Sequence, residues 1–110
     1  MELEVSTARE QGLCVVSVVG EVDVYTSPTL KQSLIDADDG CSVVVVDMDK
    51  VAFIDSSGLG VLVGALRRAR EDGGDLRIVC ARDNVLKIFR ITGLDKVFPM
   101  FATLAEAREA

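Results

Sequence analysis

The chain has 110 residues, of which 49% are hydrophobic and 27% charged, a composition typical of a folded globular protein. We therefore expect residues 1–110 to form one domain. Its 12 basic and 18 acidic residues give a net charge of −6, which argues against nucleic acid and an anionic membrane surface as partners. The chain contains no histidine, which excludes sites that depend on that side chain, such as a Ser-His-Asp triad.

The three cysteines, Cys14, Cys41 and Cys80, are far apart in the sequence, and each stands near valine. We predict that all three are small core residues of a reduced, cytoplasmic protein. A structural zinc site needs closely paired cysteines, and we expect no metal and no cofactor. The first ten residues lack a basic, apolar leader, and no apolar run is long enough to cross a membrane.

The first third of the chain predicts two strands and a helix. Residues 3–6 alternate weakly, as a short edge strand does, and residues 13–19 form a β-branched run typical of a buried strand. Residues 20–23 end this strand or turn. A hydroxyl residue followed by proline predicts a helix over residues 26–37. Its core face would carry Leu30, Leu34 and Ile35.

Residues 42–47, SVVVVD, predict the central strand of a sheet that is covered on both faces, because four valines follow one another. Residues 51–54 lead from this strand to a helix predicted over residues 58–71. The core stripe of that helix comprises Leu59, Leu62, Val63, Leu66 and Ala69. Two glycines lie off the stripe and three arginines cluster in the last turns: Gly60, Gly64, Arg67, Arg68 and Arg70. The arginines form either a solvated face or a rim that steers an acidic partner.

The remaining elements are a strand at residues 76–81, a helix that Asp83 or Asn84 caps and Gly93 ends, a short strand at 97–98, and a helix from Thr103 to about Arg108. The helix that ends at Gly93 would bury Val85, Leu86, Ile88 and Phe89. Strands and helices thus alternate after the second strand. This alternation predicts the α/β class with a largely parallel sheet.

One segment, residues 53–60 (FIDSSGLG), points to chemistry rather than to scaffold. Hydroxyl groups and glycines at a helix start leave free backbone N–H groups, and the positive end of the helix dipole favours a phosphate there. The structural alternative is that one serine caps the helix and the glycines allow close packing. The residues alone leave both interpretations open.

Residues 53–62 (FIDSSGLGVL) resemble the signature of the STAS domain family, the bacterial anti-sigma factor antagonists. Residues 20–23 (GEVD) resemble the family's first block, and residues 75–79, 85–89 and 92–94 resemble its third. The blocks occur in the family's order over nearly the whole chain. The resemblance implies a single α/β domain, a four- to five-stranded mixed sheet with helices packed mainly on one face.

The resemblance also implies a binding protein rather than an enzyme. In this family the unphosphorylated antagonist binds an anti-sigma factor serine kinase and frees the sigma factor. The kinase, which binds the ATP, phosphorylates the serine after the motif aspartate, Ser56 in this chain. Phosphorylation releases the antagonist, and a serine phosphatase restores it. Asp23 would lie near Ser56, and the expected partner-binding residues are Asp23, Asp55, Ser56, Ser57 and Gly58.

The residues suggest a reason why Ser56 rather than Ser57 would accept the phosphate. Ser57 stands beside Gly58 and closer to the first helical turn, so we predict that its hydroxyl caps the helix. Ser56 would then be free to face a partner. For Asp23 and Asp55 the alternative is a purely structural role at a strand end or turn.

Three other functions compete with this one. The glycines at 58, 60 and 64 spell GxGxxxG, one residue away from the dinucleotide-binding fingerprint, and Arg82 would suit a 2′-phosphate, but 110 residues leave no second nucleotide-binding half. Residues 36–40 (DADDG) lack the glycine and glutamate spacing of a calcium loop and indicate an acidic turn. STAS domains also occur as interaction modules that are not phosphorylated, and binding of an ATP-loaded kinase would separate that role from the switch.

Overall fold

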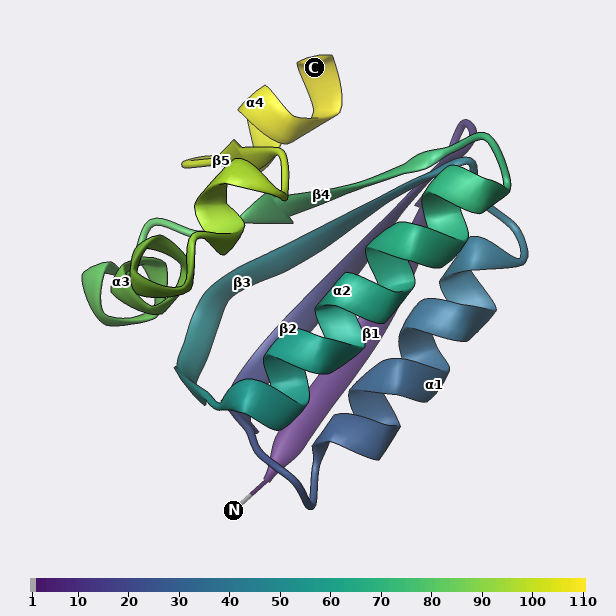
Figure 1. Ribbon diagram of the computed structural model, residues 1–110. Coiled ribbons are helices and arrows are strands. Elements are labelled where there is room, and N and C mark those ends of the chain that lie inside the picture. The colour runs from purple at the N-terminus through teal and green to yellow at the C-terminus, as the bar shows by residue number, and fades with distance from the viewer. Residues whose placement is uncertain (1) are drawn as a thin grey trace.

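Strands and helices alternate along the chain in the order that the sequence predicts (Figure 1). The computed structural model describes residues 2–110. Its elements are β1 (Leu3–Glu10), β2 (Leu13–Val22), α1 (Ser27–Asp38), β3 (Val43–Ile54), α2 (Ser56–Glu71), β4 (Asp75–Val79), α3 (Asp83–Thr92), the 3-10 helix η1 (Leu94–Lys96), β5 (Met100–Phe101) and α4 (Leu104–Glu109). Within residues 2–110, no helix is both long and apolar enough to cross a bilayer.

The strands form one five-stranded mixed sheet in the order β1-β2-β3-β4-β5. β1 is antiparallel to β2, and all other neighbours are parallel. Helices α1 and α2 lie side by side over one face of the sheet (Figure 1). This arrangement confirms the α/β class, the mixed sheet and the central place of the valine-rich strand.

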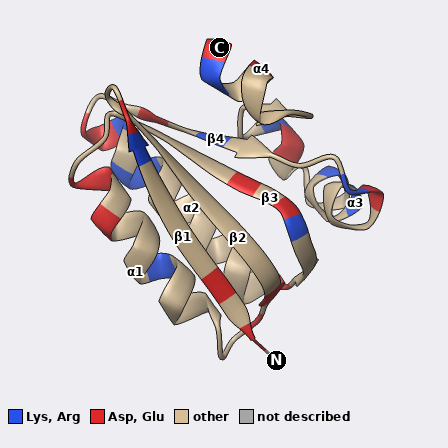
Figure 2. Cartoon of the chain, turned by 180° about the vertical axis from the view of Figure 1, so that it is seen from behind, with Lys and Arg blue, Asp and Glu red and all other residues tan. Residues whose placement is uncertain are grey.

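The valine run of β3 is covered from both sides, as its composition predicts. Val44 and Val46 belong to the main core beneath α1 and α2. Val45 belongs to a second cluster with Val79 and with Ala107 of α4, on the opposite face. Seen from behind, the rest of that face along β1, β2 and β3 is open (Figure 2). The helices therefore cover mainly one face of the sheet.

Helix α2 packs on the sheet through the predicted stripe. Leu59, Leu62, Leu66 and Ala69 are buried, together with Ala65, whereas Val63 is only half-buried. In α1, Leu30 and Leu34 are buried, and Ile35 is half-buried. The 3.6-residue period thus predicts the centre of each buried stripe correctly, but it overestimates the burial of residues at the edge of the stripe.

Several predicted boundaries differ from the structure: β2 and β3 run on to Val22 and Ile54, α2 begins two residues early, and three further elements also depart from the prediction. β1 extends to Glu10 because it pairs with β2 along its whole length; its outer residues are exposed, so hydrophobic alternation does not mark them. The strand predicted at residues 97–98 is wrong, because Phe98 packs edge-to-face on Phe89 and the strand is Met100–Phe101. α3 follows Arg82, and neither predicted residue, Asp83 or Asn84, is its N-cap.

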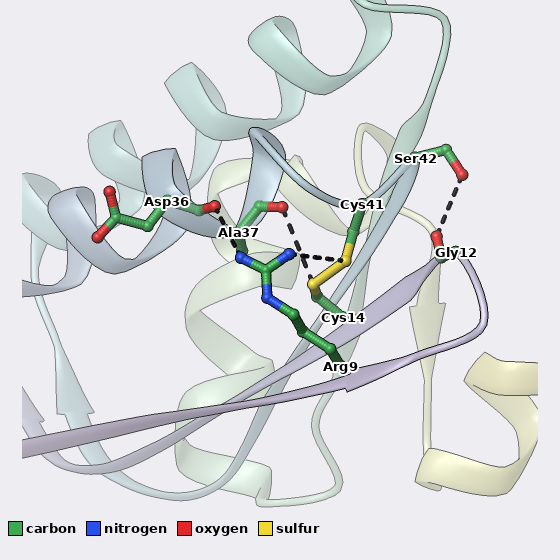
Figure 3. The surroundings of a disulfide bond; sticks show 7 residues. All are labelled: Arg9, Gly12, Cys14, Asp36, Ala37, Cys41 and Ser42. Carbon is green, nitrogen blue, oxygen red and sulfur yellow. Dashed lines mark hydrogen bonds between the residues drawn. A yellow bond between two sulfur atoms is a disulfide. The ribbon is translucent and has the colours of Figure 1, made fainter.

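Two of the three cysteines are joined, contrary to the prediction of three reduced thiols. Cys14 and Cys41 form a disulfide with their Cα atoms 5.7 Å apart (Figure 3). Cys14 lies at the start of β2 and Cys41 just before β3, and the parallel pairing of these strands brings the two side chains together. The sequence indicates that both are buried, but not that they meet. Cys80 is free and buried, as predicted.

Candidate functional site

The carboxyl ends of β2 and β3 carry the predicted site residues. Val22 pairs with Ile54, and the Asp55 N–H donates to the Val22 carbonyl oxygen at 3.1 Å. Asp23 directly follows Val22, and α2 begins directly after Asp55. Two segments that are more than thirty positions apart in the chain therefore meet at one end of the sheet. All five predicted partner-binding residues lie there.

Asp55, and not Ser57, caps α2. One carboxylate oxygen of Asp55 accepts the Ser57 N–H at 2.9 Å and the Gly58 N–H at 3.3 Å. Its backbone is extended, as an N-cap requires. The prediction that Ser57 caps the helix is wrong because the helix begins at Ser56, two residues before the predicted start at Gly58. Aspartate and serine cap about equally well, so the D-S-S sequence alone does not show which residue occupies the position.

Exposure, rather than capping, distinguishes the two serines. Ser56 is the first residue of α2 and is exposed, whereas Ser57 is half-buried on the side of α1. Neither hydroxyl hydrogen-bonds to another residue within 2–110, although the backbone N–H of Ser57 binds Asp55. Ser56 is thus the hydroxyl that an approaching protein reaches more easily.

Gly58 lets α2 begin very close to the strand ends. A Cβ at this buried position would lie 2.5 Å from Cγ1 of Val22 and 2.7 Å from Cγ1 of Ile54. All of the glycines at 58, 60 and 64 lie inside α2 and not in a strand-to-helix turn. The dinucleotide fingerprint needs such a turn, where backbone N–H groups face a pyrophosphate, so this alternative does not fit the structure.

Asp23 is buried and holds the turn between β2 and α1. Its Oδ1 accepts the backbone N–H groups of Thr26 and Tyr25, each at 2.9 Å. The hydrogen bond from the Thr26 N–H, aided by that from Tyr25, keeps the pKa of Asp23 below its ordinary value. Asp23 is therefore an ionised group at neutral pH, fixed in place beside the start of α2.

Val24 and Tyr25 are surface residues that the sequence analysis did not single out. They lie in the turn after Asp23, where Val24 is 59% exposed and Tyr25 is 88% exposed. They fall between the strand end predicted at residues 20–23 and the helix predicted from residue 26. The D-x-x-T pattern of Asp23 and Thr26 would have indicated their exposure. Such a pattern forms a tight turn, in which the two intervening side chains point to solvent. Exposed aromatic residues beside a site are common anchors for a protein partner.

The arginine cluster of α2 divides into two parts. Arg67 and Arg70 are exposed, and Arg70 pairs with Asp75 at 3.2 Å. Arg68 is half-buried and faces α1, where it lines a groove with Ser57 and Lys31. The predicted solvated face thus consists of Arg67 and Arg70 only.

Comparison with known proteins gives a consistent result. The sequence profile described as "STAS domain" matches residues 4–107. The chain is 36% identical over 95 residues to the anti-sigma-B factor antagonist of Staphylococcus aureus (strain NCTC 8325 / PS 47), covering 86% of this chain and 88% of that protein. It is 28% identical over 102 residues to the anti-sigma-B factor antagonist of Bacillus subtilis (strain 168), covering 93% and 94%.

A solved structure agrees with these relatives. The crystal structure of an anti-sigma factor antagonist from Mycobacterium paratuberculosis superposes with a TM-score of 0.91 and 29% identity, over 98% of this chain and 92% of that one. The resemblance drawn from residues 53–62 is thereby confirmed over almost the full length. On its sequence and its fold, the chain belongs to the STAS domain family.

Proposed function

We propose that this chain is an anti-sigma factor antagonist, a single STAS domain that works by binding rather than by catalysis. Its relatives carry that name and match it almost end to end. In its unphosphorylated form it binds an anti-sigma factor serine kinase and frees the sigma factor. We place this exchange in the cytoplasm, where ATP is available to the kinase. Because thiols are kept reduced there, we expect the Cys14–Cys41 bond to be transient in the cell.

The exposed hydroxyl of Ser56 is the observation that carries the proposal. Asp55 caps the helix by accepting the N–H groups of Ser57 and Gly58, and the Ser56 hydroxyl stands at the surface without a hydrogen-bond partner among residues 2–110. The kinase transfers the γ-phosphoryl group of its ATP to this oxygen: the new bond joins Ser56 Oγ to phosphorus, and ADP leaves. A serine phosphatase removes the group by hydrolysis.

Charge explains why phosphorylation would release the partner. A phosphoserine adds a charge of about −1.5 to −2. It would stand next to the Asp55 carboxylate and on the same sheet end as ionised Asp23. Because Asp55 already binds the N–H groups of Ser57 and Gly58, they are not free to neutralise the phosphate. A partner in close contact would have to desolvate this added charge, whereas the free protein leaves it in water.

The test is to incubate the protein with its cognate kinase and ATP, locate the phosphate by mass spectrometry and measure partner binding. We expect phosphate on Ser56 and loss of the complex. Ser56→Ala should bind the kinase and stay bound when ATP is added, whereas Ser56→Asp should bind poorly. Ser57→Ala is the matched control for the position of the phosphate and should still be modified. Binding without any phosphorylation would instead identify an interaction module that is not a switch.

A further inference from the structure

A groove of about 280 Å³ runs between α1 and α2, beginning beside the proposed phosphorylation site. Its lining residues are Lys31, Ser57, Gly60, Val61, Gly64 and Arg68. Those from α2 recur at every third or fourth position, so they form one strip along the helix over three turns. Because Ser57 stands at one end, a protein that covers Ser56 can reach into the groove without a second interface.

The packing of the chain does not explain the two glycines of this strip. Gly58 is required because a Cβ would strike Val22 and Ile54, but a Cβ at Gly60 would meet nothing within 4 Å. At Gly64 it would meet only Nη1 of Arg68, at 3.6 Å. Glycine inside a helix is less favourable than alanine, so both positions give up stability. What the glycines do provide is an open floor in the groove.

Positive charge lines the groove and lacks a partner. Nε and Nη2 of Arg68 are buried without a hydrogen bond to any residue within 2–110. Two ion pairs form among residues 2–110, Arg70–Asp75 and Arg108–Glu10, and neither involves Arg68 or Lys31. No carboxylate lines the groove, although the total charge of the chain is −6. Buried guanidinium N–H groups without acceptors are unfavourable, so Arg68 would gain hydrogen bonds by turning its guanidinium group toward an oxyanion that enters the groove.

Acidic groups lie on the other side of Arg68 and offer a competing explanation. The Arg68 charge favours the ionised form of Asp38, which lies close to Asp72. Arg68 makes no ion pair with either carboxylate. Its Nη1 lies over Gly64, one turn back toward the start of α2. The guanidinium group thus extends along the groove, toward Ser57.

We infer that this groove binds a carboxylate side chain of the anti-sigma factor, held by Arg68 and Lys31. The inference rests on the proposed function. A planar guanidinium group binds a carboxylate with two parallel hydrogen bonds, and the Lys31 ammonium adds a second cation. The carboxylates of Asp23 and Asp55 at the sheet end would attract basic side chains of the partner. The cations of the groove would attract an acidic one. Two charges of opposite sign along one interface fix the orientation in which the partner docks.

The test measures the affinity of the unmodified protein for its cognate anti-sigma factor. Arg68→Gln should weaken binding about tenfold or more, because a charge-assisted pair is lost. Gly60→Ala should also weaken binding, although it should raise the melting temperature, because the methyl group narrows the groove and favours the helix. Arg67→Gln is the matched control, with the same charge change on the exposed face. It should bind as the parent chain does.

The possible outcomes separate the explanations. If the parent chain binds and both groove variants bind equally well, the groove inference fails and the proposed function stands. If Arg68→Gln changes only the pH dependence of unfolding, the role of Arg68 is to stabilise the charges of Asp38 and Asp72. In that case the groove inference also fails. Saturable binding of inorganic phosphate in the groove, with partner binding unchanged in the variants, would assign the groove to a free oxyanion and overturn the carboxylate. If the parent chain binds no anti-sigma factor, both proposals fall.

Discussion

The cap of α2 yields a quantitative prediction that separates neighbouring residues. In Asp55→Ala the acceptor of two backbone N–H groups is lost at the start of α2. In Ser57→Ala only a hydroxyl without a partner among residues 2–110 is lost, from a position inside the helix. The two substitutions are only two residues apart in the chain. Even so, Asp55→Ala should lower the free energy of unfolding clearly, whereas Ser57→Ala should not.

The magnitude follows from the contacts that each side chain makes. Loss of an N-cap typically costs about 0.5–2 kcal/mol. Removing a carboxylate from the positive end of the helix dipole costs about 0.3–1 kcal/mol more. We expect Asp55→Ala to lower the free energy of unfolding by about 1–2 kcal/mol. Ser57→Ala should leave it unchanged or raise it by about 0.5 kcal/mol, because alanine favours helix more than serine does.

Urea denaturation and thermal melting of the two variants and the parent would measure these differences. Unfolding entropy scales with length, so 1 kcal/mol corresponds to about 4 °C in a chain of 110 residues. Asp55→Asn is the control, because its side-chain oxygen still caps the helix while the charge is gone. Equal losses for Asp55→Ala and Ser57→Ala, or a loss for Ser57→Ala alone, would refute the assignment of the cap.

Three further predictions concern the disulfide and two acidic groups. Cys14→Ser or Cys41→Ser should lower the free energy of unfolding by about 3.5 kcal/mol, the chain-entropy value for a loop of this length, and a reductant should do the same to the parent in urea denaturation. Burial, and next the neighbouring Asp72, raise the pKa of Asp38, so the folded chain takes up a proton more readily than the unfolded chain. The free energy of unfolding should therefore fall as pH rises through that raised pKa. Asp72→Asn should flatten this part of the pH profile and raise stability at neutral pH. Thermal melting at a series of pH values would show both effects. Asp23→Asn keeps an oxygen for the Tyr25 and Thr26 N–H groups, so its melting temperature should be nearly that of the parent. Because the negative charge is lost, calorimetry should find weaker partner binding. Binding equal to that of the parent would leave Asp23 a turn residue only.

The sequence predicts the core of this fold well because the core has a strong period. The four valines of β3 predict a strand covered on both faces, and Val44 and Val45 do lie in different clusters. The stripe of α2 is predicted for the same reason, since Leu62 and Leu66 face the sheet. In both cases burial alone determines the pattern, and burial is what hydrophobic periodicity records.

Features that depend on pairing are not visible in the sequence. The far half of β1 is a strand because it bonds to β2, and its exposed side chains show no alternation. Cys14 and Cys41 meet because two parallel strands start side by side. In each case the decisive partner is distant in the chain, and a single sequence carries no record of it.

The same limit applies within the candidate site. Asp55, Ser56 and Ser57 are all suitable N-caps, and the choice depends on where the pairing of Val22 with Ile54 ends β3. The groove beside Ser57 needs Lys31 from another helix, which no motif in α2 indicates. The location of the site was thus predictable from the residues, whereas the division of roles among its side chains required the backbone.

The disulfide and the start of α2 stand at opposite ends of the same strand. Cys14 lies near the beginning of β2 and Val22 at its end, a span of roughly 26 Å for an extended strand. Changes at sites this far apart, with no shared partners, add nearly independently. Oxidation or reduction at one end can therefore set how long each molecule survives in the folded state, while the other end keeps the same affinity for its partner.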